Sequence, residues 1–318
     1  MLVRFGYVAI AMNIPNGSPN KTVTVKTIEK IENQSDRNSR LRHILQDNLD
    51  TTLRILFYNA AHGVHLYRMT SNTVPLATHP ITTGWDYLEE YQDKWRKIGT
   101  LIKKYDMRIS AHPDHYTLLN SQKPEVLESA LRDLNYHLSL FEAIGLSPAP
   151  QLVLHIGGLY NDKQTSILRF INVFNELPEC IRLRIMLEND DKSYSANDVL
   201  TLCQYLNCPM VLDIHHHLCH NNGEELGNLW PDIVNTWRNN VPKIHVSSPK
   251  NSKAFRSHAD NVEVADFLPF LQTAKELNRD FDVMVEAKQK DIAMFHLLDE
   301  LEKVPDVKRI GNATIKYV

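Results

Sequence analysis

Histidine and carboxylate side chains, both good ligands for divalent metal ions, occur at the ends of several short apolar segments. In chain order these residues are His112, His155, Glu188, Asp213, His245 and Glu286. Neutral imidazole combined with carboxylate suits zinc, manganese or iron, and the absence of thiolate from the set argues against a purely structural zinc site. Three acidic side chains can also bridge paired cations, which lie ~3.5–4 Å apart in catalytic centres.

The apolar segments alternate with longer segments of helical spacing. The predicted strands are Val3–Ile10, Val64–Met69, Met107–Ala111, Gln151–Ile156, Arg184–Asn189, Pro209–Ile214, Lys243–Ser247 and Phe281–Ala287. The predicted helices are Asp36–Ala61, Thr83–Tyr105, Pro124–Ile144, Lys163–Leu177, Ser195–Leu206, Glu225–Arg238, Val262–Leu277 and Asp291–Leu301. The strands lack clean polar alternation, as expected when helices cover a sheet.

Eight strand-then-helix units predict an α/β fold, a single-domain (β/α)8 TIM barrel that spans residues 1–318. A doubly wound open sheet is the alternative, but the first turn after a strand has no GxGxxG motif. In a barrel the carboxyl ends of all strands meet around one axis, so the six ligands are expected to converge there. The set therefore predicts a polynuclear metal centre, of the kind that hydrolyses phosphate esters or amides or isomerises sugars.

In two short motifs the sequence does not show which histidines bind metal. In Asp213-Ile214-His215-His216-His217 the strand is expected to end near Ile214, so any of the three histidines can turn toward the barrel axis. His258 follows a basic loop, Lys250–Arg256, and is either a phosphate or surface contact or a metal ligand. Periodicity alone does not choose among these alternatives.

Lys243 lies two positions before His245 on the same predicted strand, so its side chain points the same way, into the barrel. A buried lysine is costly unless a partner neutralises it or its pKa falls. One alternative is a salt bridge to Glu188 or Glu286. The other is that a deprotonated Lys243 reacts with carbon dioxide and becomes an anionic carbamate that binds metal.

The composition sets broad limits on the class of protein. The chain has 318 residues, 43% of them hydrophobic and 23% charged, with a formal net charge of −3, which describes an ordinary globular protein rather than a generally basic one. The four cysteines form no CxxC pair, which indicates a reduced, cytoplasmic protein. No apolar run approaches the ~20 residues of a membrane span, so no membrane partner is expected. Of the 15 histidines, His43, His137 and His296 on predicted helices are expected at the surface.

Longer motifs occur in a recognisable order along nearly the whole chain. They are Arg4-Phe5-Gly6-Tyr7, Val74–Pro80, Ser110–Tyr116, Leu187-Glu188-Asn189-Asp190, Asp213–His216, Pro242–Ser248 and Arg256–Asp260. In this combination the chain resembles the UV damage endonucleases, a family related to the endonuclease IV group of (β/α)8 nucleases.

The resemblance implies a centre of three divalent ions, commonly manganese, with zinc or magnesium as alternatives. One ion would be held by His112, His155 and Glu188, a second by Glu188, Asp213, His245 and Glu286, and a third by His216 and His258. The endonuclease IV relatives have an aspartate where this chain has Arg256, so the third ion lacks an anionic ligand. A carbamylated Lys243, which the resemblance also implies, would replace it.

The resemblance further implies the substrate contacts. Tyr7 would contact substrate, Asn13 would assist near the scissile phosphate, and His79 would line the site. His115 and Tyr116 match a lesion probe that enters the duplex, with His115 where the family more often has glutamine. The spacing around Asn13 departs from the family pattern.

The implied activity is hydrolysis of the phosphodiester bond immediately 5′ to cyclobutane pyrimidine dimers, 6-4 photoproducts and abasic sites, leaving a 3′-hydroxyl. The catalytic residues would be Glu188, Lys243, Tyr7 and Asn13. The expected partner is double-stranded DNA that contains UV lesions, bound by a monomer acting at the nucleoid. A metal-dependent sugar isomerase on the same barrel is the competing enzyme, and a DNA-binding protein without activity is the other alternative.

Overall fold

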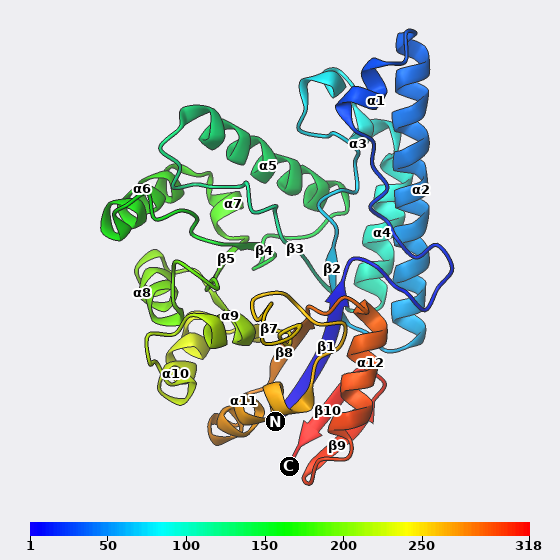
Figure 1. Cartoon of the computed structure of the whole chain (residues 1–318). Coiled ribbons are helices and arrows are strands. Elements are labelled where there is room, and N and C mark those ends of the chain that lie inside the picture. The colour runs from blue at the N-terminus through cyan, green and yellow to red at the C-terminus, as the bar shows by residue number, and fades with distance from the viewer.

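Short strands form the wall of a closed barrel in the computed structural model, which describes residues 1–318 (Figure 1). They are β1 (Leu2–Val8), β2 (Leu66–Met69), β3 (Arg108–Ala111), β4 (Leu152–Leu154), β5 (Ile185–Glu188), β6 (Met210–Asp213), β7 (Lys243–Val246) and β8 (Phe281–Val285). Each strand pairs in parallel with the next, and β1 pairs with both β8 and β2, which closes the ring. The predicted (β/α)8 fold is therefore confirmed.

Helices cover the outer face of the barrel. The longer ones are α2 (Gln34–Ala61), α4 (Gln92–Lys104), α5 (Pro124–Ala143), α6 (Lys163–Glu176), α8 (Ala196–Leu206), α10 (Leu226–Thr236), α11 (Val264–Leu277) and α12 (Lys290–Leu301). The short ones are α1 (Val25–Glu29), the 3-10 helix η1 (Pro80–Thr82), α3 (Tyr87–Glu90), α7 (Glu179–Arg182) and α9 (Ile214–Cys219). The expected continuous helix over 83–105 is wrong, because the chain breaks at Tyr91 between α3 and α4.

A carboxyl-terminal hairpin, β9 (Val307–Gly311) and β10 (Thr314–Tyr317), was not predicted from the sequence. The first residues of β1, Leu2–Arg4, pair antiparallel with β10, whereas Gly6–Val8 pair with β2. The hairpin thus pairs with the edge of β1 that β2 leaves unpaired, and Figure 1 shows both termini at this end of the molecule.

The strand register shows which side chains face the barrel interior. Lys243 and Arg4 both pair with Asp282, so these three charged side chains share the inner face. Arg4 Nε and Arg108 Nη1 each lie 2.7 Å from a carboxylate oxygen of Asp282, which is fully buried. The ion-paired members of this cluster, Arg4, Arg108 and Asp282, lie toward the amino ends of the strands, where barrel residues serve stability.

His137 on α5 is buried rather than exposed, with 2% of its surface accessible, so its expected surface position is wrong. The ring is held inside because Nε2 lies 3.0 Å from the hydroxyl of Ser71, in the loop after β2. No helix in the chain combines the length and apolarity that a membrane span requires.

Candidate metal centre

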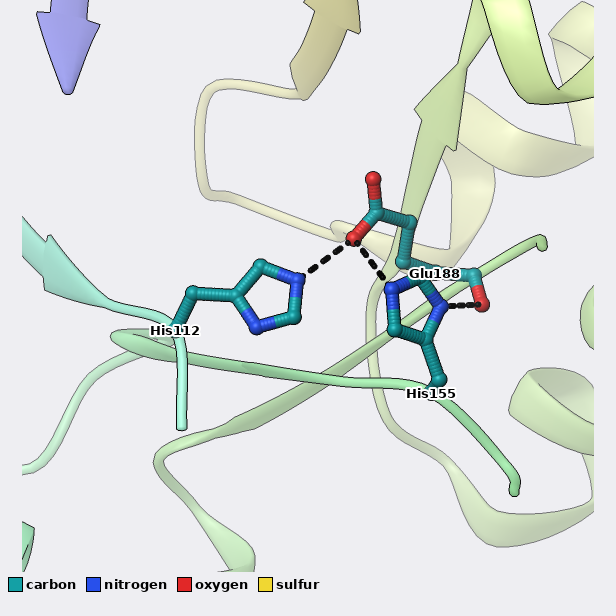
Figure 2. Close-up of side chains that lie close together, drawn as sticks. All are labelled: His112, His155 and Glu188. Atoms are coloured by element: carbon teal, nitrogen blue, oxygen red, sulfur yellow. Dashed lines mark hydrogen bonds and ion pairs between the residues drawn. The ribbon is translucent and has the colours of Figure 1, made fainter. Parts of the chain in front are cut away.

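Glu188, the last residue of β5, lies at the middle of the histidine and carboxylate residues from the strand ends. Its Oε2 atom is 3.0 Å from His112 Nε2 and 3.5 Å from His155 Nε2, as Figure 2 shows. Its Oε1 atom is 2.6 Å from His245 Nδ1 on β7. One carboxylate therefore faces histidines from opposite sides, which is the arrangement expected of a bridging ligand.

The ligand atoms form two clusters that share Glu188. The first cluster contains His112, His155 and Glu188, and the second contains Glu188, Asp213, His245 and Glu286. Within each cluster the ligand atoms lie within 4.8 Å of one another. The structure thus brings together all six residues that the sequence places at strand ends.

The donors in these clusters fit divalent metal ions. Asp213 is fully buried, and its Oδ1 accepts a hydrogen bond from the His216 backbone N–H, at 2.7 Å. Its Oδ2 has no hydrogen-bond partner. A buried carboxylate oxygen without a partner is costly, and a cation beside it removes that cost. Imidazole and carboxylate donors of this kind suit manganese or zinc.

Asp213 also begins a helix, and this local feature orients the histidines that follow it. Because its side chain caps α9, the chain turns immediately after β6 and His216 is directed toward the centre. Asn189 supports the turn, since its side-chain amide exchanges two hydrogen bonds of 2.9 Å with the Asp213 backbone. His216 Nδ1 donates to the Asn189 carbonyl at 2.9 Å, which leaves Nε2 free for a metal.

Burial disfavours a charged His216, but the nearby carboxylates of Asp213, Glu188 and Glu286 outweigh that effect and raise the pKa of His216 to about 9. The ring of His258 lies 6.3 Å from the ring of His216, centroid to centroid. These two histidines do not form a third cluster of three ligand atoms. The Arg256 side chain points instead toward Asp191, with Nε 3.6 Å from Oδ2.

Arg68 on β2 belongs to the centre and was missed in the sequence. Its Nη1 is 2.6 Å from Glu286 Oε1, and its Nη2 is 2.6 Å from His245 Nε2. Burial opposes ionisation of Glu286, yet Arg68 and then His245 hold the pKa of this carboxyl well below its usual range. An arginine inside an apolar strand is the same signal that identified Lys243, and it was available in the sequence.

Lys243 is fully buried, and its Nζ atom has no hydrogen-bond partner. The expected salt bridge to Glu188 or Glu286 is wrong, because those carboxylates pair with the histidines and Arg68. Burial, together with the positive charges of Arg108 and Arg68, lowers the pKa of Lys243 well below its usual value and outweighs the attraction of Asp282. The neutral amine is the form that reacts with carbon dioxide.

A cleft of about 250 Å³ lies next to the first cluster. Its walls include His112 and His155 on one side, and His115, Thr117 and residues 190–193 on the other. The rings of His115 and Tyr116 lie 3.9 Å apart, and Tyr116 is 71% exposed. Two adjacent rings therefore project from the turn after β3, beside the ligands of the first cluster.

Three other predicted site residues do not reach the clusters. Tyr7 is fully buried, and its hydroxyl donates to Asn59 Oδ1 on α2 at 2.6 Å. Arg4 faces the interior and Tyr7, three residues later on the strand, faces the helices, so contact between Tyr7 and substrate stays a prediction. Asn13 Nδ2 donates to the Tyr58 hydroxyl at 3.2 Å. The exposed His79 caps η1 by accepting from the Ile81 N–H.

A closed (β/α)8 barrel with two ligand clusters at the carboxyl ends of its strands defines the class: a barrel protein with a candidate polynuclear metal centre. Residues 3–318 match the family described as UV-endonuclease UvdE. The chain is 43% identical to a UV DNA damage endonuclease of Bacillus cereus (strain B4264) and 42% identical to one of Bacillus anthracis, and each alignment covers 100% of both chains. The structure entitled "Crystal Structure of SacUVDE" has a TM-score of 0.83 at 30% identity, covering 95% of this chain and 100% of that one.

The chain therefore belongs to the UV-endonuclease UvdE family, and it is a DNA repair endonuclease whose substrate is DNA. The resemblance seen in its motifs is confirmed. Endonuclease IV from Thermus thermophilus has a TM-score of 0.57 at 12% identity, and covers 95% of this chain and 100% of its own. A D-tagatose 3-epimerase-like protein has the same TM-score at 14% identity. At such low identity these likenesses show the fold alone, so they lend no weight to a sugar isomerase.

Proposed function

We propose that the chain hydrolyses the phosphodiester bond immediately 5′ to cyclobutane pyrimidine dimers and 6-4 photoproducts, and at abasic sites, in double-stranded DNA. The product carries a 3′-hydroxyl. The enzyme acts as a monomer and uses three divalent ions, with manganese as the first choice of metal. The observation that carries this proposal is the position of Glu188, which is shared by two ligand clusters at the barrel end of an endonuclease.

The residues would hold the ions in three sets. These sets are His112, His155 and Glu188, then Glu188, Asp213, His245 and Glu286, and finally His216, His258 and a carbamylated Lys243. Bound divalent ions supply activation of water at neutral pH, neutralisation of the scissile phosphodiester and stabilisation of the departing 3′ oxygen.

Other side chains would hold these ligands in place. Arg68 orients Glu286 and His245 through its two short contacts, and Asn189 fixes the backbone of Asp213. Partners of this kind restrict ligand orientation, and losing one typically costs about 10- to 100-fold in metal affinity or activity. The chain thus presents ligands that need little rearrangement when ions bind.

Carbamylation of Lys243 requires only carbon dioxide. The lone pair of the neutral amine attacks the carbon of carbon dioxide, an N–C bond forms, and one N–H proton passes to solvent, leaving an anionic carbamate. The lowered pKa of Lys243 and its lack of any partner support this step. The anion would stand in for the aspartate that Arg256 replaces in this chain.

His115 and Tyr116 would select damaged sites. Their rings would enter the duplex and occupy the space that a damaged dinucleotide leaves, and damaged bases are the cheapest to unstack. The family more often has glutamine at the position of His115. The imidazole ring of His115 preserves stacking there, but the contact of the glutamine amide is lost. A role for His79 and Asn13 near the phosphate remains part of the proposal.

The test is nicking of a duplex oligonucleotide that contains one cyclobutane dimer, measured with and without manganese, for the wild type and Glu188→Gln. Because Glu188 serves both clusters, we expect the substitution to lower the nicking rate by at least about 100-fold. The exposed Glu276→Gln on α11 is the matched control and keeps full activity. Extension of the product by a DNA polymerase reports the 3′-hydroxyl. Full manganese-dependent nicking by Glu188→Gln would contradict the proposal.

A further inference from the structure

The buried His137 on α5 is not used by the metal centre, yet it contacts the centre through one intermediate residue. The Ser71 hydroxyl donates to the carbonyl oxygen of His112 at 2.9 Å. His137 Nε2 lies 3.0 Å from the same hydroxyl oxygen. His137 Nδ1 lies 2.8 Å from the Asp133 carbonyl and donates to it, and burial lowers the pKa of His137, so the neutral ring presents Nε2 to Ser71 as an acceptor. The Ser71 hydroxyl therefore lies between two acceptors, the His112 carbonyl and His137 Nε2. The backbone of a candidate metal ligand is thus tied to α5.

The opposite side of His137 leads toward the lesion-probing turn. Asp133 lies one helical turn before His137, and its backbone carbonyl accepts from His137 Nδ1 at 2.8 Å, while its carboxylate Oδ1 lies 3.5 Å from the same nitrogen. The other oxygen, Asp133 Oδ2, accepts from the Thr117 hydroxyl at 2.5 Å. The backbone N–H of Thr117 donates to the Asp114 carbonyl at 2.8 Å, and so closes the turn over residues 114–117 that carries the two exposed rings.

These contacts form one continuous set, which we name the α5 network: the His112 carbonyl, Ser71, His137, Asp133 and Thr117. Two of its members are shielded from water, since His137 is 2% and Thr117 is 6% exposed, while the Asp133 side chain keeps 22% of its surface accessible. Hydrogen bonds in such a setting are costly to break, because the freed groups stay buried. The network fixes two points of one loop, at 112 and 117, to the same 20-residue helix.

We propose that the α5 network is a positioning device that holds the lesion-probing turn at a set distance from His112, so that a lesion engaged by His115 and Tyr116 places its 5′ phosphodiester at the metal centre. This inference rests on the proposed function. Ser71, Asp133, Thr117 and His137 are positioning residues, since none belongs to a ligand cluster. A displacement of about 1 Å between a bound substrate and the reacting groups can cost about 100-fold in rate.

The first test needs no DNA. Amide hydrogen exchange is measured at Thr117 in the wild type, in Ser71→Ala and in His137→Phe. Loss of one hydrogen bond of the network should raise exchange at Thr117 by about 3- to 10-fold, although neither substituted residue contacts Thr117. Ser139→Ala on α5, whose hydroxyl donates to the Tyr136 carbonyl and is not part of the network, is the matched control and leaves exchange unchanged. Unchanged exchange at Thr117 in Ser71→Ala would overturn the proposal.

The second test is a double-mutant cycle on nicking of the dimer-containing duplex. Ser71→Ala removes the contacts at one end of the network, and Thr117→Val removes the contact at the other end. In the wild-type background their effects on kcat/KM should be non-additive. In the His137→Phe background, where the network is already interrupted, their effects should be additive. The preference for damaged over undamaged duplex should fall by about 10-fold in His137→Phe, with metal content unchanged. His137→Gln, whose amide oxygen can still accept from the Ser71 hydroxyl, should recover most of that preference.

The outcomes separate this proposal from the proposed function. A wild type that does not nick damaged duplex refutes the function, while the exchange measurement still decides whether the network exists. Additive effects of Ser71→Ala and Thr117→Val in an active wild type refute the network alone. If His137→Phe does not fold, the exchange of Ser71→Ala and the activity of His137→Gln decide the matter.

Discussion

Charged side chains inside the barrel wall differ in how their burial is compensated. Arg68 has short contacts to Glu286 and His245, so its charge is paired. Lys243 has no partner at all, and the free energy is lowest when its amine is neutral. Two basic side chains of the barrel wall, Arg68 on β2 and Lys243 on β7, therefore have opposite roles: one keeps a carboxylate ionised, and the other gives up its proton.

This difference predicts how stability depends on pH in protein free of metal and bicarbonate. The folded pKa of Lys243 lies below the ordinary value of 10.5. Its stabilising contribution is therefore complete above that value and is lost as the pH falls toward the folded pKa. The loss should be about 1.4 kcal/mol per pH unit in the free energy of unfolding. In Lys243→Met this component should be absent, so the difference in the free energy of unfolding between the two proteins should change as the pH falls below 10.5.

Urea unfolding at each pH measures this difference, and Lys288→Met, at an exposed site, is the matched control. Parallel pH profiles for the wild type and Lys243→Met would mean that Lys243 is charged when folded. In that case the proposed carbamate would lose its support.

Helix starts are the elements whose local chemistry can be read most directly from the sequence. Ser195 and Asp198 form a capping box at the start of α8, with the Asp198 carboxylate 2.9 Å from the Ser195 N–H. Asp213 caps α9 in a similar way but is also a candidate metal ligand, so one side chain sets both the turn after β6 and the second cluster. Helix α2 begins before its predicted start at Asp36, because Asn33 caps it.

Ser195→Ala should lower the free energy of unfolding by about 1 kcal/mol, because the first turn of α8 loses the acceptor for one backbone N–H. Ser195 also donates to Glu224 at 2.5 Å, which the substitution removes as well. Thermal and urea unfolding measure the change, with Thr201→Ala on the exposed face of the same helix as the control. Nicking activity should be unaffected, and equal destabilisation by both variants would contradict a capping role.

At the scale of the whole molecule, the two ligand clusters join strands that are far apart in the chain. Residues from β5, β6 and β7, together with residues that directly follow β3, β4 and β8, converge at one end of the barrel. Such a site cannot persist in the unfolded chain, so metal binding and folding are linked. The barrel and its centre should therefore respond to metal as one unit.

Manganese at 100 times its dissociation constant should raise the free energy of unfolding by about 2.7 kcal/mol for each occupied site, and a chelator should reverse the change. Glu188→Gln should lose most of this increase because it alters both clusters, whereas Glu276→Gln should keep it. Thermal unfolding over a manganese titration is the measurement. An increase of equal size in Glu188→Gln would show that the ions bind elsewhere.

The sequence by itself determined the eight-unit barrel and the convergence of six ligands. An apolar run of strand length predicts a buried strand from its own residues. The convergence of the strand ends then follows from the barrel topology. Neither prediction requires knowledge of which residues contact each other. The residues that hydrogen-bond their neighbours in sequence, such as Ser195, were equally accessible to this reasoning.

Only the tertiary structure decided what lies opposite each side chain. It directed Tyr7 to Asn59 and His216 to the centre, buried His137 against Ser71, paired Arg68 with Glu286 and left Lys243 without a partner. Each of these contacts joins residues from different elements, and most of them lie far apart in the chain. A period of two places residues on a common face of a strand but does not say whether a helix or the barrel interior covers that face. That choice follows from the closure of the ring, which no local segment contains.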